Sequence, residues 1–202
     1  MPERTRRMRS TAVHSTTKRY PIMYGIVNKA IQGLVTENYG EETWNQIKEI
    51  SGVQTDLFLS NEPYPDETTY QLAGAASKVL QTPVEDILVA FGEYWLLKTA
   101  MRSYGPLVTA GGSSLKEFLI NLPSFHNRVM LIYPELQPPQ FKVTHLEENS
   151  LHLHYYSDRP SLQHFLVGLL QGMGKMFDTV ITIEQIESRD EGSDHEVFKV
   201  SW

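Results

Sequence analysis

The sequence predicts an α+β domain in which a helical N-terminal lobe is followed by a β-β-α-β-β unit with an antiparallel four-stranded sheet. From Met23 to about residue 133, apolar residues recur every three or four positions, which is the spacing of one helix face. From residue 140 onward they alternate with polar residues, as in strands that bury one side of a sheet. A long helical stripe separates two such alternating pairs. Helices packed on an antiparallel sheet fit this order.

The composition is that of one globular domain with one sizeable core. The chain has 202 residues, of which 41% are hydrophobic and 21% charged, and both values are ordinary. No stretch approaches the roughly 18 uninterrupted apolar residues of a membrane span. There is no cysteine, which excludes disulfides, thiolate metal sites and covalent c-type haem attachment. The lack of cysteine also fits a reducing compartment, so we expect a cytoplasmic protein.

Charge divides the chain into a basic extension, residues 1–22, and an acidic domain, residues 23–202. The first 20 residues contain six basic side chains and one acidic one, Glu3, whereas the whole chain has a net charge of −6. The acidic domain disfavours nucleic acid and anionic membranes as partners, because both bind positive surfaces. The extension lacks the apolar segment of an export signal. It is a disordered tail, a transit-like segment, or an upstream extension of a protein that starts at Met23.

The first four predicted helices cover residues 23–39, 42–50, 66–80 and 83–102. Gly40 and Gly52 are expected to end the first two, because glycine is a common helix terminator. Asp66 can cap the third helix. Thr82 and Glu85 have the spacing of a capping box at the start of the fourth.

A further helical region contains His126. Ser113 or Ser114 can cap a helix over 115–121, and Pro123 is expected to restart or kink it. A buried imidazole needs partners for its ring nitrogens, because an unpaired buried polar group costs about 1–3 kcal/mol. The region therefore indicates a core histidine bonded to a backbone carbonyl, or a metal ligand. His126 shares its predicted face with apolar and aromatic residues only, namely Leu119, Leu122, Val129, Met130 and Tyr133.

Two hairpins and one helix are predicted after residue 139. Residues 140–156 predict the first hairpin, and 180–186 with 196–202 predict the second. The helix between them carries an apolar stripe from Leu162 to Phe177. Gly168 and Gly172 within this helix are not a dinucleotide-binding motif, because that motif needs a turn from strand to helix. They are expected to let this helix pack closely against a flat partner.

Three polar side chains follow the first hairpin at alternate positions: Tyr155, Ser157 and Arg159. In an extended chain, alternate residues face the same way. A phenol, a hydroxyl and a guanidinium on one side could bind carboxylate or phosphate. The alternative is a solvated strand end with Arg159 paired to an acidic neighbour. Together with His126, this segment predicts a ligand that carries both a metal and carboxylates, and haem has both.

Other candidate sites are weaker. His152 and His154 lie on one strand face, but two ligands do not close a metal site. A solvated histidine face is the simpler interpretation. Ser113 and Ser114 lack the context of a hydrolase nucleophile.

The motifs together resemble a known family. His126 lies in Leu122-Pro-Ser-Phe-His-Asn-Arg-Val129 and is followed by Tyr155-x-Ser157-x-Arg159. With the opening Met23-Tyr-Gly-Ile-Val-Asn-Lys-Ala-Ile31 and Phe91-Gly-Glu-Tyr-Trp95, this pattern resembles the haem-nitric oxide/oxygen-binding (H-NOX) domain. That domain is the gas-sensing module of soluble guanylate cyclase and of bacterial stand-alone sensors. The resemblance runs from Met23 to Trp202 and leaves out residues 1–22.

The resemblance implies roles for nine residues around a haem b (iron protoporphyrin IX) between the lobes. His126 would be the axial iron ligand, and Tyr155, Ser157 and Arg159 would hold the propionates. Pro139 would press on the macrocycle. The gas side would be formed by Val27, Ile31, Trp95 and Phe165. For Trp95 and Phe165, simple core packing is the alternative.

The resemblance also implies a sensor without catalytic machinery. A phenyl ring at Phe165 favours NO over O₂, because bound O₂ needs a hydrogen-bond donor and NO does not. His164 or the Trp95 indole could still supply a donor; CO binding is possible. NO binding would weaken the iron bond to His126 and free its helix. The signal would pass in trans to a histidine kinase or a cyclic-di-nucleotide enzyme. The alternatives are a haem peroxidase or oxygenase, and an adaptor with a vestigial haem site.

Overall fold

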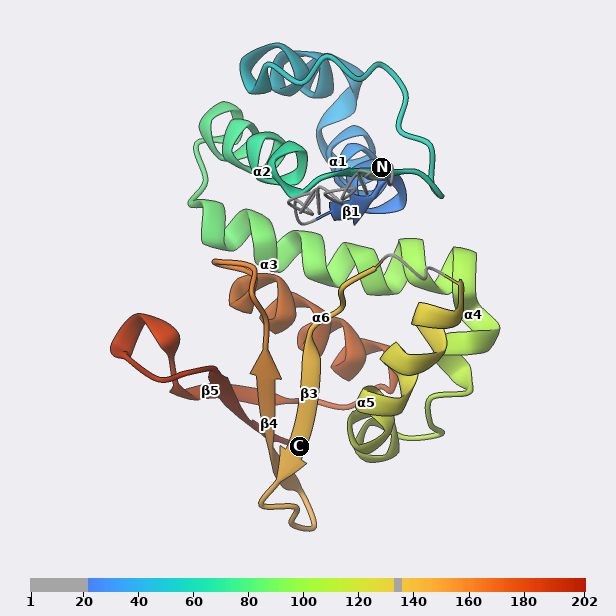
Figure 1. Cartoon of the computed structure of the whole chain (residues 1–202), viewed down its shortest axis with the longest axis vertical. Coiled ribbons are helices and arrows are strands. Elements are labelled where there is room, and N and C mark those ends of the chain that lie inside the picture. Colours follow the sequence, from blue (N-terminus) through green and yellow to red (C-terminus); the bar gives the residue numbers. More distant parts are fainter. Residues whose placement is uncertain (1–21, 133–135) are drawn as a thin grey trace, which may run out of the picture.

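The computed structural model describes residues 22–132 and 136–202. The helical lobe lies on one side of a long helical segment, and the sheet lies on the other (Figure 1). The first half contains β1 (Ile22–Tyr24), α1 (Gly25–Ser51), β2 (Pro63–Pro65), α2 (Asp66–Leu80), α3 (Val84–Tyr94), the π-helix η1 (Trp95–Ala100), α4 (Met101–Thr109) and α5 (Leu115–Ile132). The second half contains β3 (Gln140–Thr144), β4 (Ser150–Tyr156), α6 (Gln163–Met176), β5 (Thr182–Glu187), the 3₁₀ turn η2 (Arg189–Glu191) and β6 (Glu196–Ser201).

The predicted fold class is confirmed. Strands β3, β4, β6 and β5 form an antiparallel sheet in that order. Leu153 of β4 pairs with Val143 of β3 on one side and with Phe198 of β6 on the other. Leu151, Leu153 and Tyr155 are buried, so the alternation in the sequence marks the covered face of β4. Because β4 is an inner strand, the segment that leaves it starts from a fixed point.

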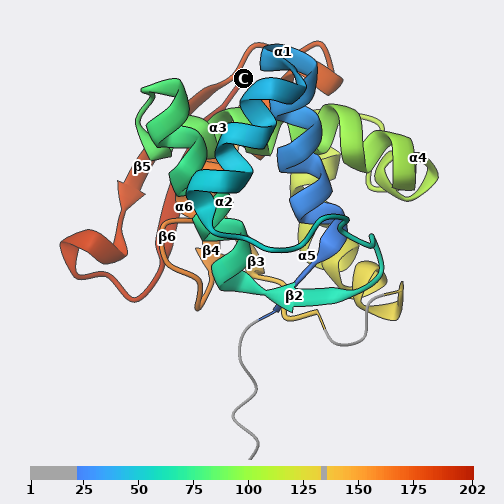
Figure 2. The same cartoon turned by 90° about the horizontal axis from the view of Figure 1, so that it is seen from above.

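The first two predicted helices are one element, α1, with a break at Gly40. Gly40 has φ 87° and ψ 166°, a backbone conformation that is essentially restricted to glycine. The helix therefore kinks sharply at Gly40, where the sequence predicted that it would end. Beyond it the helix resumes and ends at Gly52, which is left-handed with φ 70°. Seen from above, α1 and α2 lie side by side over the rest of the domain (Figure 2).

The helix predicted over 83–102 is longer and less regular than expected. It continues as α3, η1 and α4 to Thr109, and it crosses the whole molecule between the two halves (Figure 1). The predicted capping box is absent. The Thr82 hydroxyl donates to the carbonyl of Leu80, and the Thr82 carbonyl accepts from the Ser77 hydroxyl. Thr82 is thus held by the end of α2 and not by the start of α3.

A single helix, α5, replaces the two segments predicted around Pro123. Pro123 lies inside it. The predicted serine cap is confirmed, because the backbone N–H of Glu117 donates to the Ser114 hydroxyl oxygen at 3.3 Å. The Glu117 carboxylate in turn accepts from the backbone N–H and the hydroxyl of Ser113. These contacts fix the start of the helix that carries His126.

Close packing of α6 on α3 depends on two glycines, Gly168 and Gly92. Close packing of α6 was predicted from the sequence, and its partner is a helix. A Cβ atom added at Gly168 would lie 2.0 Å from the carbonyl oxygen of Val89, and one at Gly92 would lie 2.1 Å from that of Phe165. No side chain fits at these distances. The two helix backbones therefore touch at this crossing, which brings Phe165 directly against α3.

Two large hydrophobic clusters form most of the core of the described residues, one centred in the helical half and one centred on the sheet. The helical cluster contains Ile31, Phe58, Leu72 and Phe91, and the sheet cluster contains Leu119, Leu153 and Phe198 among others. No helix in the two described segments is long and apolar enough to cross a membrane. Of the predicted extension 1–22, only Ile22 is described, and it belongs to β1 opposite Pro65. The remainder of that prediction lies outside the described residues.

Candidate functional site

An apolar cavity of about 230 Å³ lies between the two halves. Its walls come from α1, α2, α3, η1 and α4 on the helical side, and from α5, α6, β3 and β4 on the other side. Most of its lining is aliphatic or aromatic. Seven of the residues selected from the sequence line it, namely Val27, Trp95, His126, Pro139, Tyr155, Arg159 and Phe165.

His126 lies on α5 and faces this cavity. Its ring stacks on Phe141 of β3, with 5.2 Å between ring centroids and 8° between planes. Its Nδ1 is buried and has no hydrogen-bond partner among the described residues. Burial lowers the pKa of His126 to about 4, so the imidazole is neutral near pH 7. The ring is partly accessible, but the space it faces is the cavity.

The α5 face predicted around His126 is only partly correct. Leu119 and Leu122 are buried and Val129 lines the cavity, whereas Met130 is 36% exposed. Tyr133 lies outside the described residues. The residues of α5 that line the cavity are three or four positions apart, as on one face of a helix. That face includes His126 and excludes Met130. The lining residues are Phe118, Leu122, Phe125, His126, Val129 and Ile132.

Arg159 is buried and already holds an acidic partner. Its Nε donates to Oδ2 of Asp66 at 2.6 Å, and its Nη1 and Nη2 donate to the backbone carbonyls of Gln137 and Ile22 at 2.6 and 2.9 Å. The alternative weighed for this residue, a pairing with an acidic neighbour, is therefore present. A guanidinium has five N–H groups, so two remain without a partner in the described structure. They are available for a carboxylate.

Tyr155 and Ser157 line two adjoining spaces, although their side chains form a hydrogen bond with each other. Strand β4 ends at Tyr156 and the chain then bends. Tyr155 lines the apolar cavity, whereas Ser157 lines an adjoining polar cleft of about 780 Å³. Burial raises the pKa of Tyr155, and a hydrogen bond with the Ser157 side chain partly opposes this. Arg159 and Pro139 line both spaces, so the cleft is the polar mouth of the cavity.

The polar mouth includes a second phenol, Tyr70 of α2. Its hydroxyl donates to the carbonyl of Pro160 at 2.8 Å. Burial, followed by the nearby Asp66 carboxylate, raises the pKa of Tyr70 to about 12. The phenol is therefore a neutral donor that ties α2 to the segment after Arg159.

The residues expected on the gas side are placed unequally. Val27, Trp95 and Phe165 pack against the helical cluster, and the Phe165 ring lies 4.9 Å from that of Phe91. Ile31 does not line the cavity. It is 3% exposed and belongs to the helical cluster itself. Four residues beyond Val27, it lies about 6 Å further along α1, which places it past the end of the cavity.

Sequence reasoning missed Asp66 as a partner of the site and missed Arg189 altogether. Asp66 was expected to cap α2, whereas its carboxylate binds Arg159. Arg189, in η2, donates to the backbone carbonyls of Ser157 and Arg159. Both contacts span long stretches of chain. The sequence pointed to one of these contacts only, because pairing of Arg159 with an acidic residue was the alternative interpretation of that position.

His126 does not belong to a cluster of potential metal ligands among the described residues. No group of three or more His, Cys, Asp or Glu side chains is placed to hold a metal ion in the parts of the chain that are described. His152 and His154 instead contact other histidines. The rings of His145 and His152 are 4.4 Å apart, and Nδ1 of His154 lies 2.8 Å from Nε2 of His195. A metal bound at His126 would therefore need its other ligands from a cofactor, as in a porphyrin.

The sequence profile of the family described as haem-NO-binding matches residues 24–185. The chain belongs to this family. H-NOX is the name of its domain, and such domains bind haem and act as sensors. The chain is 31% identical over 177 residues to soluble guanylate cyclase gcy-32 of Caenorhabditis elegans, covering 86% of this chain and 26% of the cyclase. It is 33% identical over 123 residues to guanylate cyclase soluble subunit beta-2 of Rattus norvegicus, covering 58% and 18%. The chain thus spans about a quarter or less of these relatives.

Solved H-NOX structures share the fold. An H-NOX protein from S. oneidensis in the Fe(II)NO ligation state superposes with a TM-score of 0.80 at 22% identity, covering 89% of this chain and 98% of that one. The unliganded Fe(II) H-NOX protein from K. algicida gives 0.78 at 25% identity, covering 89% and 96%. The fold predicted from the resemblance is therefore confirmed for nearly all of the domain.

The residues of this H-NOX domain fit a haem. A neutral imidazole faces an apolar cavity, and its buried Nδ1 has no partner among the described residues. The mouth of that cavity has a buried guanidinium with two N–H groups that have no acceptor among the same residues. A metal ligand needs the neutral imidazole. Two acidic groups need the cationic donors. These two features suit the central metal and the edge carboxylates of a metalloporphyrin.

Proposed function

We propose that this chain is a haem-based sensor that binds nitric oxide at the ferrous iron of haem b. The observation that carries the proposal is the placement of His126 and Arg159 in the lining of one cavity. His126 lies on α5 and Arg159 follows β4. The imidazole suits the iron of the cofactor, and the guanidinium suits its carboxylates.

The residues would divide the task of holding the group. His126 would bind the iron through a ring nitrogen, and its low pKa keeps the imidazole unprotonated. Arg159, Tyr155 and Ser157 would bind the propionates at the polar mouth. Pro139, which lines both the cavity and the mouth, would contact the ring. When bound, the group supplies a ferrous iron that coordinates a diatomic gas.

The proposed preference for nitric oxide over oxygen rests on the apolar side chains at the predicted gas side. Val27, Trp95 and Phe165 present aliphatic and aromatic surface, and the Phe165 ring is held against Phe91. A phenyl ring cannot donate the hydrogen bond that stabilises bound oxygen, whereas nitric oxide binds ferrous haem without one. The same side chains supply no acid or base for cleaving an O–O bond, which favours sensing over peroxidase or oxygenase chemistry.

We propose that α5 carries the signal to a separate output domain or protein. The helix holds His126 near its middle and ends in Met130, Leu131 and Ile132, which are 36%, 84% and 53% exposed. A change in the attachment of His126 would therefore reach an apolar surface within two turns. A histidine kinase or a cyclic-di-nucleotide enzyme is the proposed kind of partner.

An absorption spectrum of the ferrous protein, alone and with NO, CO and O₂, tests the proposal. We expect a Soret band that shifts with NO and CO and stays unchanged in air. His126→Ala should lose the band and regain it when imidazole is supplied. His145→Ala, at an exposed histidine, should behave as the wild type. A protein that stays colourless with added hemin, or a His126→Ala variant with ordinary haem affinity, would reject the proposal.

A further inference from the structure

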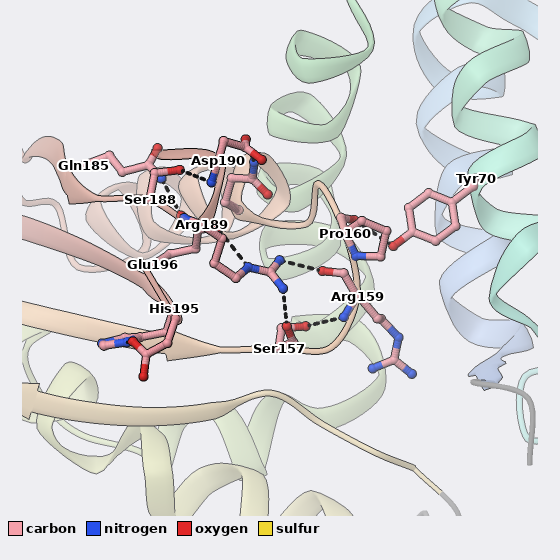
Figure 3. A network of polar contacts seen from close by, with 12 residues as sticks. Tyr70, Ser157, Arg159, Pro160, Gln185, Ser188, Arg189, Asp190, His195 and Glu196 are labelled. Carbon is pink, nitrogen blue, oxygen red and sulfur yellow. Dashed lines mark hydrogen bonds and ion pairs between the residues drawn. The ribbon is translucent and has the colours of Figure 1, made fainter. Parts of the chain in front are cut away.

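Arg189 binds the backbone of the segment 157–159, which carries two of the proposed propionate-binding residues. Its Nη1 donates to the carbonyl of Ser157 at 2.7 Å, and its Nη2 donates to the carbonyl of Arg159 at 3.0 Å. Figure 3 shows the guanidinium between the two carbonyls, with the Arg159 side chain pointing away from it. One planar fork thus fixes two peptide groups on either side of Asp158.

Glu196, at the start of β6, holds Arg189 in this position. Its side chain is 1% exposed, and its Oε1 accepts from Nε of Arg189 at 3.1 Å. Its Oε2 accepts from the side-chain amide of Gln185 at 2.6 Å and from the backbone N–H of Arg189 at 3.3 Å. Three donors thus hold this buried carboxylate in place. Because Glu196 is paired with Tyr155 of β4 across the sheet, the anchor is part of the same rigid layer.

The segment after β4 would otherwise have few restraints. Apart from those to Arg189, its main-chain contacts with described residues are a hydrogen bond from the N–H of Arg159 to the Ser157 hydroxyl at 3.2 Å and one from the Tyr70 hydroxyl to the Pro160 carbonyl at 2.8 Å. At its far end the Arg159 guanidinium is held by Asp66. Arg189 therefore fixes the position of the Arg159 backbone, and Asp66 fixes the position of the Arg159 guanidinium.

We propose that the Arg189–Glu196 pair is a positioning device that aims Arg159 at the haem carboxylates. The inference rests on the proposed function, but it assigns a role to residues that lie beyond the matched family region 24–185. Arg189 touches only protein atoms in this role. It acts by keeping the N–H groups of Arg159 directed at the polar mouth, so that little rotamer freedom is lost when a carboxylate binds.

The first test measures haem release from the full chain. Arg189→Lys keeps a cation beside Glu196 but removes the fork that spans two carbonyls. We expect transfer of haem to excess apomyoglobin to become about tenfold faster, which corresponds to about 1.4 kcal/mol. Lys175→Met, which removes the exposed ion pair with Glu93 at 2.5 Å, is the matched control and should release haem at the wild-type rate.

The second test needs no haem and reads the position of Arg159 directly. Hydrogen exchange of the Arg159 Nε–H, which donates to Asp66, should be faster in Arg189→Lys than in the wild type. The amide of Leu153 in β4 reports global opening and should not change. Equal acceleration of both groups, or no acceleration of the Nε–H, would overturn the inference. If the wild type binds no haem, the proposed function fails while this measurement still decides the role of Arg189.

Discussion

Asp66 and Arg159 are 93 residues apart in the chain and meet with 2.6 Å between Oδ2 and Nε. Their side chains are only 6% and 9% exposed. Asp66 is the first residue of α2 in the helical half, and Arg159 follows the inner strand β4 of the sheet half. The ion pair therefore joins the two halves at the mouth of the cavity, beside the groups that would bind carboxylates.

Asp66→Ala should destabilise the domain strongly. It leaves the buried Arg159 guanidinium without its carboxylate, and breaking a buried pair in this way costs roughly 3–5 kcal/mol. Urea unfolding measures the change. Lys175→Met, at a pair in which Lys175 is 61% exposed, should cost about 1 kcal/mol or less. Equal losses for the two variants would show that the Asp66 contact contributes little.

Gly168→Ala should destabilise the domain, whereas Gly74→Ala should not. The new Cβ at Gly168 would lie 2.0 Å from the Val89 carbonyl oxygen, while one at Gly74 meets nothing within 4 Å. Overpacking typically costs about 1–3 kcal/mol, and alanine in a helix gains roughly 0.5–1 kcal/mol over glycine. Thermal unfolding of both variants should give shifts of opposite sign. Two shifts of the same sign would contradict the backbone contact between α3 and α6.

Phe165→Tyr should create measurable oxygen binding in the ferrous protein. The ring lines the cavity against Phe91, and a hydroxyl there would supply a donor worth about 1 kcal/mol. Oxygen titration followed by absorption spectroscopy measures the effect. Phe125→Tyr adds the same hydroxyl beside His126 on α5 and should leave oxygen binding unchanged. A response at Phe125 and none at Phe165 would reverse the assignment of the two sides.

Glu117→Gln should lower the unfolding temperature at pH 7, and its effect should shrink as the pH falls. The hydroxyl and backbone N–H of Ser113 lower the pKa of Glu117 from 4.5. A carboxyl whose pKa is lowered by folding stabilises the native state above its unfolded pKa. That stabilisation disappears as the pH falls through the lowered pKa. Melting curves of both proteins from pH 7 to pH 3 should therefore converge, and a constant gap would contradict the cap.

The fold class and the order of helices and strands predicted from periodicity are confirmed, because burial on one face dictates where apolar residues recur, whereas several helix boundaries differ. The alternation of Leu151, Leu153 and Tyr155 identified the covered face of β4 correctly. The segment beyond it was less predictable. Alternate spacing places Tyr155 and Ser157 on one side only while the chain stays extended, and it bends once β4 ends at Tyr156.

Contacts between distant charges could not be derived from the sequence at all. Asp66 and Arg189 reach the site through folding of the whole domain, and each has a simpler local interpretation as a helix cap or a solvated turn residue. Such pairs form only between side chains that the tertiary fold brings within a few ångströms of each other. Periodicity carries no information about them.

The π-helix η1 has a consequence for insertions and deletions in this chain. Its wide turn lies between Trp95, which lines the cavity, and Val108, which is fully buried. A π-turn holds one more residue than an α-helical turn, and each residue of an α-helix rotates the chain by about 100°. Loss of a single residue here would convert the wide turn into an ordinary α-helical turn and leave the indole nearly in phase with Val108, whereas the same loss within α3 would rotate one flank by about 100°. The domain should therefore tolerate the deletion of one residue within η1 better than the deletion of one residue within α3.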